Sequence, residues 1–293
     1  MILTIGNFDG VHAGHRNFLS QIREIAIEKN CLVAVLTFVP HPRQILSPTN
    51  DYLINTYEER RCLLQEVGID YLYEINFTRD FSTLSPLEFL TKYIGDNKKI
   101  KDIFIGHDFA FGANKAGNYQ VLKEFCSERS IGFFLGDEFH VNNSNVSSTI
   151  IRQTLKMGDI PLAHEYLKRD FFMSGRIIKG FGRGKKIGFP TANIQYSEDR
   201  IVPKEGVYAT KTFCDGSYYL SVTNIGRNPT FEGSEKISIE THILDFNRDI
   251  YGEEIRIHFI SYLRGEVRFS SINELVEQIK KDAQSSRQMG MTW

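Results

Sequence analysis

The sequence contains few cysteines, and none of them stands near another. Four occur in the whole chain, Cys31, Cys62, Cys126 and Cys214, and no CxxC pair is among them. This scatter argues against a disulfide framework and against a zinc knuckle, because both need closely and regularly spaced cysteines. We therefore expect the protein to work in a reducing compartment.

Long apolar runs and an excess of one charge are missing as well. The longest nearly apolar run, Cys31–Val39, is far shorter than the ~20 residues that cross a membrane, and no basic leader precedes Asp9 and His12. Lys and Arg number 35 against 36 Asp and Glu, so the net charge is −1 and no chain-wide positive field attracts duplex nucleic acid. These observations predict a soluble, cytoplasmic protein without a membrane or nucleic-acid partner.

The length and composition are typical of a folded protein with two domains. The 293 residues are about twice an average domain, and 41% of them are hydrophobic. The pattern of apolar residues changes near Gly158, where a helix-like segment leads into a region of two-residue alternation. We predict two domains, residues 1–158 and 159–293.

The first half alternates between strand-like and helix-like patterns. Short apolar runs predict strands, and apolar residues at helical spacing predict helices. The expected strands are Ile2–Ile5, Cys31–Phe38, Tyr71–Ile75 and Ile103–Ile105, and the expected helices include Tyr57–Val67, Pro86–Tyr93 and Tyr119–Arg129. Strands that alternate with helices predict an α/β fold, with a parallel, Rossmann-like sheet covered on both faces.

The second half shows the period of antiparallel strands. The expected strands are Val207–Phe213, Tyr218–Val222, Ile237–Leu244 and Glu254–Ile260. The pair Asp215-Gly216 between the first two is a hairpin signal. Ser271 and Glu274 form a capping box ahead of apolar residues at helical spacing. We predict a small antiparallel β-barrel or sandwich with a closing helix.

A first candidate site is the run GNFDGVHAGH, residues 6–15, at the junction of the first strand and the first helix. His12 and His15 stand three residues apart, so both rings can face one ligand. A helix start offers unpaired N–H groups and a positive dipole, and glycines let the backbone approach closely, so a phosphate chain would fit. The alternative is that the glycines only make a tight turn and the histidines cap the helix.

Two later segments could contribute to the same site. Ser147, Ser148, Thr149 and Arg152 place three hydroxyls and a guanidinium at a helix start, where they suit a triphosphate, although a plain N-cap cluster is the alternative. The segment GHDFAFG, residues 106–112, follows a strand, where ligands bind in open parallel sheets. Its aromatic residues could hold a flat ring or pack in the core.

A second candidate site is GFGRGKKIGFPTAN, residues 180–193. It matches neither GxGxxG nor GxxxxGK[ST], and no helix pattern follows it, so it is neither a dinucleotide fingerprint nor a Walker loop. Glycine N–H groups with Arg183, Lys185 and Lys186 still suit phosphate, and Thr191 with Asn193 offers oxygens to a hard cation such as Mg²⁺. The alternative is a flexible basic hairpin.

Glu240 lies on the polar face of the expected strand Ile237–Leu244, opposite Ile239 and Thr241. A carboxylate on that face is usually solvated, so the pattern alone does not make Glu240 a catalytic residue.

The N-terminal motifs resemble a known enzyme family. GNFDGVHAGH and VSSTIIR, residues 146–152, resemble the HxGH nucleotidyltransferase superfamily. With TFVPHP, residues 37–42, and GHDFAFG, the chain more closely resembles the FMN adenylyltransferase module of bacterial FAD synthetases. Asn118 stands where that family commonly has an acidic residue.

This resemblance implies roles for individual residues. His12, His15 and Arg152 would be the catalytic groups at the ATP phosphates. The other candidate contacts to ATP are Gly6, Phe8, Asp9, Gly10, Gly14, Ser147, Ser148 and Thr149. The flavin would lie near Asp108, Phe111 and Gly112.

The C-terminal motifs resemble the riboflavin kinase module, whose fold is a six-stranded antiparallel barrel. They are GRGKKIGFPTAN, NIGRNPTF, IETHILDF and DIYG, residues 182–193, 224–231, 239–246 and 249–252. The resemblance implies that Thr191 and Asn193 contact Mg²⁺ and ATP phosphates, and that Glu240 is the catalytic base. The other candidate contacts to phosphate are Gly182, Arg183, Gly184 and Lys185.

Together the resemblances predict a bifunctional enzyme of flavin synthesis. Its C-terminal domain would phosphorylate riboflavin to FMN with ATP and Mg²⁺, and its N-terminal domain would adenylylate FMN to FAD and release pyrophosphate. We expect the partners to be riboflavin, FMN and ATP, and the protein to be a monomer or a weak oligomer. Two alternatives remain: a single-function nucleotidyltransferase acting on another phosphate acceptor, and a flavin-binding regulator without catalysis.

Overall fold

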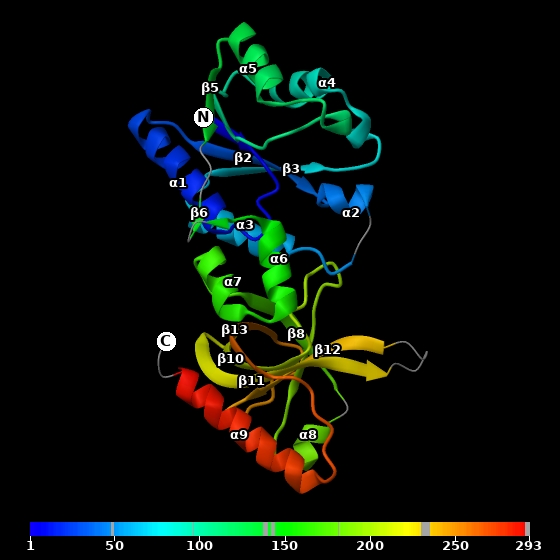
Figure 1. The fold of residues 1–293 in the computed structure, drawn as a ribbon. Coiled ribbons are helices and arrows are strands. Elements are labelled where there is room, and N and C mark those ends of the chain that lie inside the picture. The colour runs from blue at the N-terminus through cyan, green and yellow to red at the C-terminus, as the bar shows by residue number, and fades with distance from the viewer. Residues whose placement is uncertain are drawn as a thin grey trace. The chain divides into compact units, whose positions relative to one another are not determined.

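The chain folds into two compact units, Met1–Ser148 and Thr149–Trp293, in a computed structural model (Figure 1). The structure describes residues 1–47, 50–95, 97–136, 140–141, 144–180, 182–229 and 235–290. The division falls earlier than the predicted one, and the residues that each activity requires stay a prediction. No described helix is long and apolar enough to cross a membrane.

The first unit is built on a five-stranded sheet with the order β3-β2-β1-β4-β5. Its strands are β1 (Ile2–Ile5), β2 (Val33–Val39), β3 (Tyr71–Asn76), β4 (Asp102–Gly106) and β5 (Gly132–Gly136). All neighbouring strands run parallel, which confirms the predicted parallel sheet. The sequence did not predict β5, which pairs with β4 at the edge.

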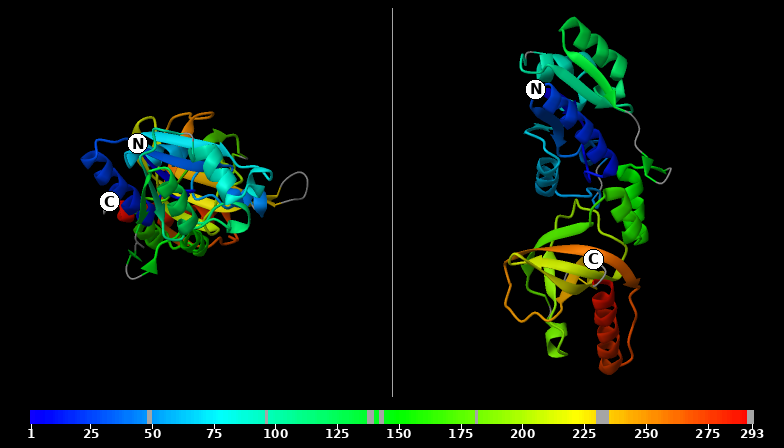
Figure 2. Two further views of the ribbon diagram at one scale, coloured as in Figure 1. Left: turned by 90° about the horizontal axis from the view of Figure 1, so that it is seen from above. Right: turned by 90° about the vertical axis from the view of Figure 1, so that its left-hand side faces the viewer.

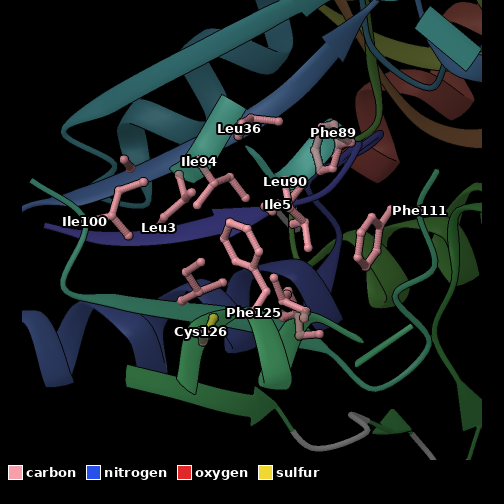
Figure 3. Packing of buried hydrophobic residues seen from close by; sticks show 14 residues of the cluster. Leu3, Ile5, Leu36, Phe89, Leu90, Ile94, Ile100, Phe111, Phe125 and Cys126 are labelled. Atoms are coloured by element: carbon pink, nitrogen blue, oxygen red, sulfur yellow. The ribbon is translucent and has the colours of Figure 1, made fainter. Parts of the chain in front are cut away.

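Two layers of helices cover this sheet because successive residues of a strand face opposite sides. On one side, α1 (Ala13–Glu28) and α3 (Tyr57–Glu66) pack on Ile2, Val33 and Val35. On the other side, α4 (Pro86–Leu90) and α5 (Tyr119–Glu128) pack on the alternate residues. Figure 3 shows the ring of Phe125, from α5, directed toward Leu3 and Ile5 of β1.

Shorter elements connect these layers. They are α2 (Pro42–Leu46), η1 (Phe81–Thr83), η2 (Thr91–Gly95), η3 (Ala113–Lys115), β6 (His140–Val141) and β7 (Ser144–Asn145). The single helix predicted over Pro86–Tyr93 is instead α4 followed by the π-helical turn η2. The Ser85 hydroxyl caps α4, and Glu88 reaches back to the Ser85 N–H.

The second unit contains all of α6 (Ser148–Met157) after its first residue, then α7 (Ile160–Leu167). It continues as a closed barrel, in the order β10-β11-β12-β9-β8-β13. The strands are β8 (Phe172–Ile178), β9 (Ala192–Gln195), β10 (Gly206–Cys214), β11 (Ser217–Pro229), β12 (Glu235–Ile243) and β13 (Glu254–Arg264). All pairs are antiparallel, so the predicted barrel is confirmed. Asp215 and Gly216 form the predicted hairpin turn, with φ of 50° and 74°.

The last helix, α9 (Ile272–Gly290), lies against the outside of β10 and β11 (Figure 2). Ala283 packs on Val207 and Val222, and the buried Asp282 accepts hydrogen bonds from Arg264 at 2.7 to 3.1 Å. The helix continues well beyond the apolar residues that predicted it. Its start is capped by Ser271, as predicted, while the Glu274 carboxylate accepts from Ser270 N.

The barrel interior contains hydroxyl groups as well as apolar side chains. The fully buried hydroxyls belong to Thr210, Thr212, Ser221, Thr223 and Thr241. They form a chain of hydrogen bonds of 2.8 to 3.0 Å, in the order Thr212, Ser221, Thr210, Thr223, Thr241. Because Thr241 faces inward, Glu240 and His242 on either side of it face outward, as the alternation predicted.

Candidate functional site

The first candidate site begins where β1 ends. In this strand order β2 and β3 lie on one side of β1, and β4 and β5 lie on the other, so the order of the strands reverses between β1 and β4. Ligands of open parallel sheets bind at the carboxyl ends of the strands at such a point. Gly10 and Phe8 adopt φ of 86° and 49°, which turns the chain sharply toward α1. A Cβ on Gly6 would lie 2.9 Å from the ring of Phe8, so Gly6 is needed for packing and Phe8 fills the turn.

His12 and His15 lie together at the start of α1, as predicted. His12 is the N-cap, its Nδ1 accepts from the His15 N–H at 3.3 Å, and the two rings stack at 3.6 Å. The pKa of His15 lies well below its ordinary value of 6.5. The main cause is desolvation, and the smaller one is repulsion from the neighbouring His12 ring when both carry a proton. His15 is therefore neutral at pH 7, and among the described residues its buried Nδ1 has no hydrogen-bond partner.

The first residue of α6 reaches the same loop. The Ser148 hydroxyl donates to the backbone oxygen of Asp9 at 2.8 Å, which joins two motifs that are far apart in the sequence. The Asp9 carboxylate accepts from Ile54 N at 3.0 Å, so it anchors the loop. A Cβ on Gly14 would lie 3.3 Å from the His12 ring, so the absence of a side chain at Gly14 gives that ring its place.

Asn7 is a polar residue of this loop that the sequence analysis did not select. Its backbone oxygen accepts from the buried guanidinium of Arg60 at 3.0 Å. Its buried side-chain oxygen has no hydrogen-bond partner among the described residues. A buried acceptor without a donor costs free energy unless a ligand completes it, so Asn7 belongs with the candidate binding residues. The sequence could have indicated Asn7 by its position inside the motif, between Gly6 and Phe8.

The remaining N-terminal candidates occupy different surroundings. Ser147 and Thr149 are exposed, and Arg152 is half-buried on α6 in the second unit, so their roles stay predictions. Asp108 is exposed after β4, whereas Phe111 is buried in the core against Phe89. Phe111 therefore has the packing use that was the alternative for these aromatic residues, and a flavin contact there stays a prediction.

Local geometry explains two other positions of the segment. Gly112 adopts φ of 72°, and a Cβ there would lie 2.8 Å from the backbone nitrogen of Pro86. Asn118 is the N-cap of α5, where its side-chain oxygen accepts from the N–H groups of Gln120 and Val121. Because Asp is an equally good N-cap, the acidic residue that the family commonly has there could serve the same purpose.

The second candidate site forms between β9 and β12. Residue Glu240 of β12 pairs in register with Asn193 of β9, and the Thr191 hydroxyl donates to Glu240 Oε2 at 3.2 Å. The structure thus brings together the three residues that the sequence analysis selected. A Cβ on Gly180 would lie 2.3 Å from Asn193 Nδ2, so the glycine gives the Asn193 amide its space.

The basic loop before β9 contains a short helix that the sequence did not predict, α8 (Arg183–Lys186). Gly182 precedes it with φ of 66°, and a Cβ on Gly184 would lie 2.3 Å from the Phe189 oxygen. Lys185 is exposed, and the Arg183 side chain lies outside the described part of the structure. The loop therefore folds tightly on itself, although its contacts to phosphate stay predictions.

A hollow of about 510 Å³ lies beside Glu240's strand. Its walls include Phe189 and Pro190 of the loop, His242 and Leu244 after Glu240, and Ala283 of α9. The lining also contains charged side chains, among them Asp245, Lys280 and Arg287, so the hollow could take a small organic ligand that carries polar groups. His242 Nδ1 lies 2.8 Å from the Pro190 oxygen, and its ring meets that of Phe189 edge-on at 5.4 Å.

The residues that could hold a metal are oxygen donors. Among the described residues, no group of three or more His, Cys, Asp or Glu side chains could hold a metal ion. The Thr191 hydroxyl and the Asn193 amide oxygen are hard donors next to a carboxylate, which suits Mg²⁺ that keeps part of its shell from phosphates and water. The donor set therefore fits an ion that arrives with ATP.

Comparison with known proteins matches each half of the chain to a family model. The family model for FAD synthetase matches residues 1–150, and the one for riboflavin kinase matches residues 167–290. The chain belongs to the bifunctional riboflavin kinase/FMN adenylyltransferase family. The predicted membership is confirmed, and the riboflavin kinase match removes the support for a single-function nucleotidyltransferase.

Members of this bifunctional family match over nearly the whole chain. The protein of Listeria monocytogenes is 35% identical over 288 residues, covering 98% of this chain and 91% of its own. The protein of Bacillus subtilis is 36% identical over 290 residues, covering 97% and 91%. A crystal structure from Streptococcus pneumoniae, described as a macrolide-efflux protein, has a TM-score of 0.88 at 30% identity and covers 98% and 93%. The two family models that match this chain describe flavin enzymes and not macrolide efflux.

Proposed function

We propose that this chain carries out both reactions of its family at the two sites described above. The barrel site would transfer the γ-phosphoryl group of ATP to the 5′-hydroxyl of riboflavin, and the sheet site would convert the resulting FMN to FAD. The observation that carries the proposal is that each site assembles its predicted groups: His12 with His15 in one, and Thr191 with Glu240 in the other.

In the kinase site, Glu240 would accept the proton of the riboflavin hydroxyl as that oxygen bonds to the γ-phosphorus. The bond from γ-phosphorus to the bridging oxygen breaks, and ADP leaves. Riboflavin would lie in the hollow next to β12, where Phe189 and Leu244 offer apolar walls. Mg²⁺ held by Thr191 and Asn193 would neutralise charge on the phosphates of ATP when bound.

In the adenylyltransferase site, an FMN phosphate oxygen would attack the α-phosphorus of ATP and expel pyrophosphate. No protein nucleophile is needed, because the attacking oxygen is already anionic. The His15 ring, neutral in the free protein, would donate an N–H to the phosphates, and the stacked ring of His12 would hold it in place. The hydroxyls of Ser147 and Ser148, in the same unit, would add donors to the anion site.

Chromatography of the flavins tests this proposal. The purified protein is incubated with riboflavin, ATP and Mg²⁺, and FMN and then FAD are expected to appear, with ADP and pyrophosphate as the other products. Retention of flavin without turnover of ATP would instead support the regulator that binds flavin without catalysis. FAD from supplied FMN, but no FMN from riboflavin, would refute the kinase half alone.

We also propose that the enzyme acts in the cytoplasm as a monomer or weak oligomer, without a membrane or nucleic acid as partner. Its dependence on ATP and its four scattered cysteines support this location. Cell fractionation and light scattering of the purified protein test the two parts of the proposal.

A further inference from the structure

We infer that His242 is a positioning residue of the kinase site, which fastens the loop before Thr191 to β12 through a hydrogen bond to Pro190. The inference rests on the proposed kinase function of this site. It concerns how Thr191 is kept close to Glu240, because Thr191 lies outside the ladder of backbone hydrogen bonds between β9 and β12.

The ladder between β9 and β12 ends just before the loop. Its last register pairs are Asn193 with Glu240 and Ala192 with Thr241. The next two register positions along β9 would be Thr191 and Pro190. Pro190 has no N–H group, so it cannot donate to β12 and continue the ladder.

The His242 side chain supplies the missing connection. It stands two residues after Glu240 on the same outward face of β12, and its Nδ1 lies 2.8 Å from Pro190 O. A carbonyl oxygen only accepts, so Nδ1 carries the proton and donates it, and the other ring nitrogen is left as the acceptor in the neutral ring. The edge-on contact with Phe189 holds the ring in this orientation.

Fastening Pro190 has consequences on both sides of it. Thr191 follows directly, so its hydroxyl stays within reach of Glu240 Oε2. In the other direction, the Phe189 N–H donates to the Gly184 oxygen at 2.9 Å, which links the bond at Pro190 to the glycine-rich turn that would receive phosphate. Loss of the His242 bond should therefore loosen the ATP side of the site, while Phe189 and Leu244 still line the hollow.

Three substitutions in the full-length protein separate these effects. His242→Asn keeps a donor near the position of Nδ1, His242→Gln moves the donor further from the backbone, and His242→Phe keeps the ring but removes the donor. For His242→Phe and His242→Gln we expect kcat of riboflavin phosphorylation to fall roughly 5- to 10-fold and KM for ATP to rise, as the loss of one neutral hydrogen bond allows. His242→Asn should stay within about 3-fold of the wild type. Because His242 also lines the hollow, riboflavin affinity, measured by flavin fluorescence, separates a change of that wall from a change on the ATP side.

Amide hydrogen exchange gives a readout that does not depend on catalysis. Without substrates, amides of residues 184–189 should exchange faster in His242→Phe than in the wild type, whereas those of His242→Asn should match it. The inference is overturned if His242→Phe keeps wild-type exchange and kinetics, if His242→Asn is as impaired as His242→Phe, or if riboflavin affinity alone changes. A wild-type protein that does not phosphorylate riboflavin would refute the proposed function, and exchange at the loop would still decide whether His242 fastens it.

Discussion

The two candidate sites are built in different ways. The site in the parallel sheet is formed mainly by one loop and the helix that follows it, with His12 and His15 three residues apart. The site in the barrel is formed across strands, and Thr191 meets a carboxylate that belongs to Glu240, far along the chain. A loop site can be recognised as a continuous motif, whereas a strand site becomes visible only once the register of the strands is known.

The two sites also differ in how they treat charge. His15 is half-buried, and desolvation with a neighbouring imidazole keeps it neutral. This site would therefore meet phosphate with N–H donors on a fixed backbone. Glu240 is half-buried, and its carboxylate accepts a hydrogen bond from the Thr191 hydroxyl. The first arrangement suits the stabilisation of negative charge, and the second suits the removal of a proton.

The largest expected effects come from removing one group in each site. Glu240→Gln should lower the rate of riboflavin phosphorylation by about 10²- to 10⁴-fold, as expected for loss of a general base, and leave adenylylation of supplied FMN unchanged. His15→Ala should lower adenylylation by roughly 10²- to 10³-fold and leave phosphorylation unchanged. Initial rates of both reactions, measured on both variants, check this. The separation of the sites would be wrong if either substitution slowed both reactions equally.

A smaller effect is expected when a fragment containing the barrel begins after α6 instead of at its start. Leu155 of α6 is fully buried, and its oxygen accepts from Lys204 N at 3.1 Å, so α6 contributes to the second unit. A fragment of residues 159–293 should fold and phosphorylate riboflavin, but its free energy of unfolding should be about 2 to 4 kcal/mol lower than that of residues 149–293. Urea unfolding of both fragments measures the difference. Equal stabilities would show that α6 is dispensable, and an insoluble longer fragment would contradict independent folding.

The pH should act on the two units through different histidines. The folded-state pKa of His15 lies below its ordinary 6.5, so on acidification the unfolded chain takes up this proton first. The stability of the first unit should therefore decrease as the pH falls below about 6.5, and the His15→Gln variant should lose less stability over the same range. Calorimetry at pH 7 and about pH 5.5 measures this.

The second unit provides the matched control. Burial also lowers the pKa of His164, although Asp170 opposes the shift, so His164→Gln should protect the second unit in the same way. A change of the first unit's melting temperature in His164→Gln, or of the second unit's in His15→Gln, would contradict the assignment of each histidine to its own unit.

The smallest effect is expected at Asn118. Its side chain caps α5, so Asn118→Ala should lower the free energy of unfolding by about 1 kcal/mol, and Asn118→Asp should change it by less than about 0.5 kcal/mol. Both changes should leave riboflavin phosphorylation untouched. Denaturant unfolding of the two variants measures this. If Asn118→Asp instead altered the affinity for FMN, the residue would act on the ligand beyond its role as a cap.

The sequence was enough to predict the α/β sheet, the antiparallel barrel and most elements, because hydrophobic period and turn residues are local signals. Asp215-Gly216 is an example, since the pair needs no distant contact to form its turn. It missed β5, where Gly132–Gly136 offers a short and only partly buried run. It also predicted one helix where α4 passes into the π turn at Thr91, because the apolar spacing of the two is alike.

Within the sites, the sequence showed which residues have suitable chemistry, but it did not show whether their side chains lie in a site or in the core. His12, His15, Thr191 and Glu240 stand in recognisable motifs, and the structure brings each pair together. Phe111 stands in a motif too, but its ring is in the core. The bond from His242 to Pro190 depends on the strand register, and a pattern of residues along the chain does not contain that register.

The hydroxyl chain inside the barrel has a direction. Each hydroxyl carries one hydrogen, and Thr223 donates its own to Thr241. Thr210 must then donate to Thr223, Ser221 to Thr210, and Thr212 to Ser221. All of these dipoles therefore point the same way through the lumen. A valine at any one position would leave its neighbours without a donor or an acceptor, so we expect these residues to tolerate substitution as a set rather than singly.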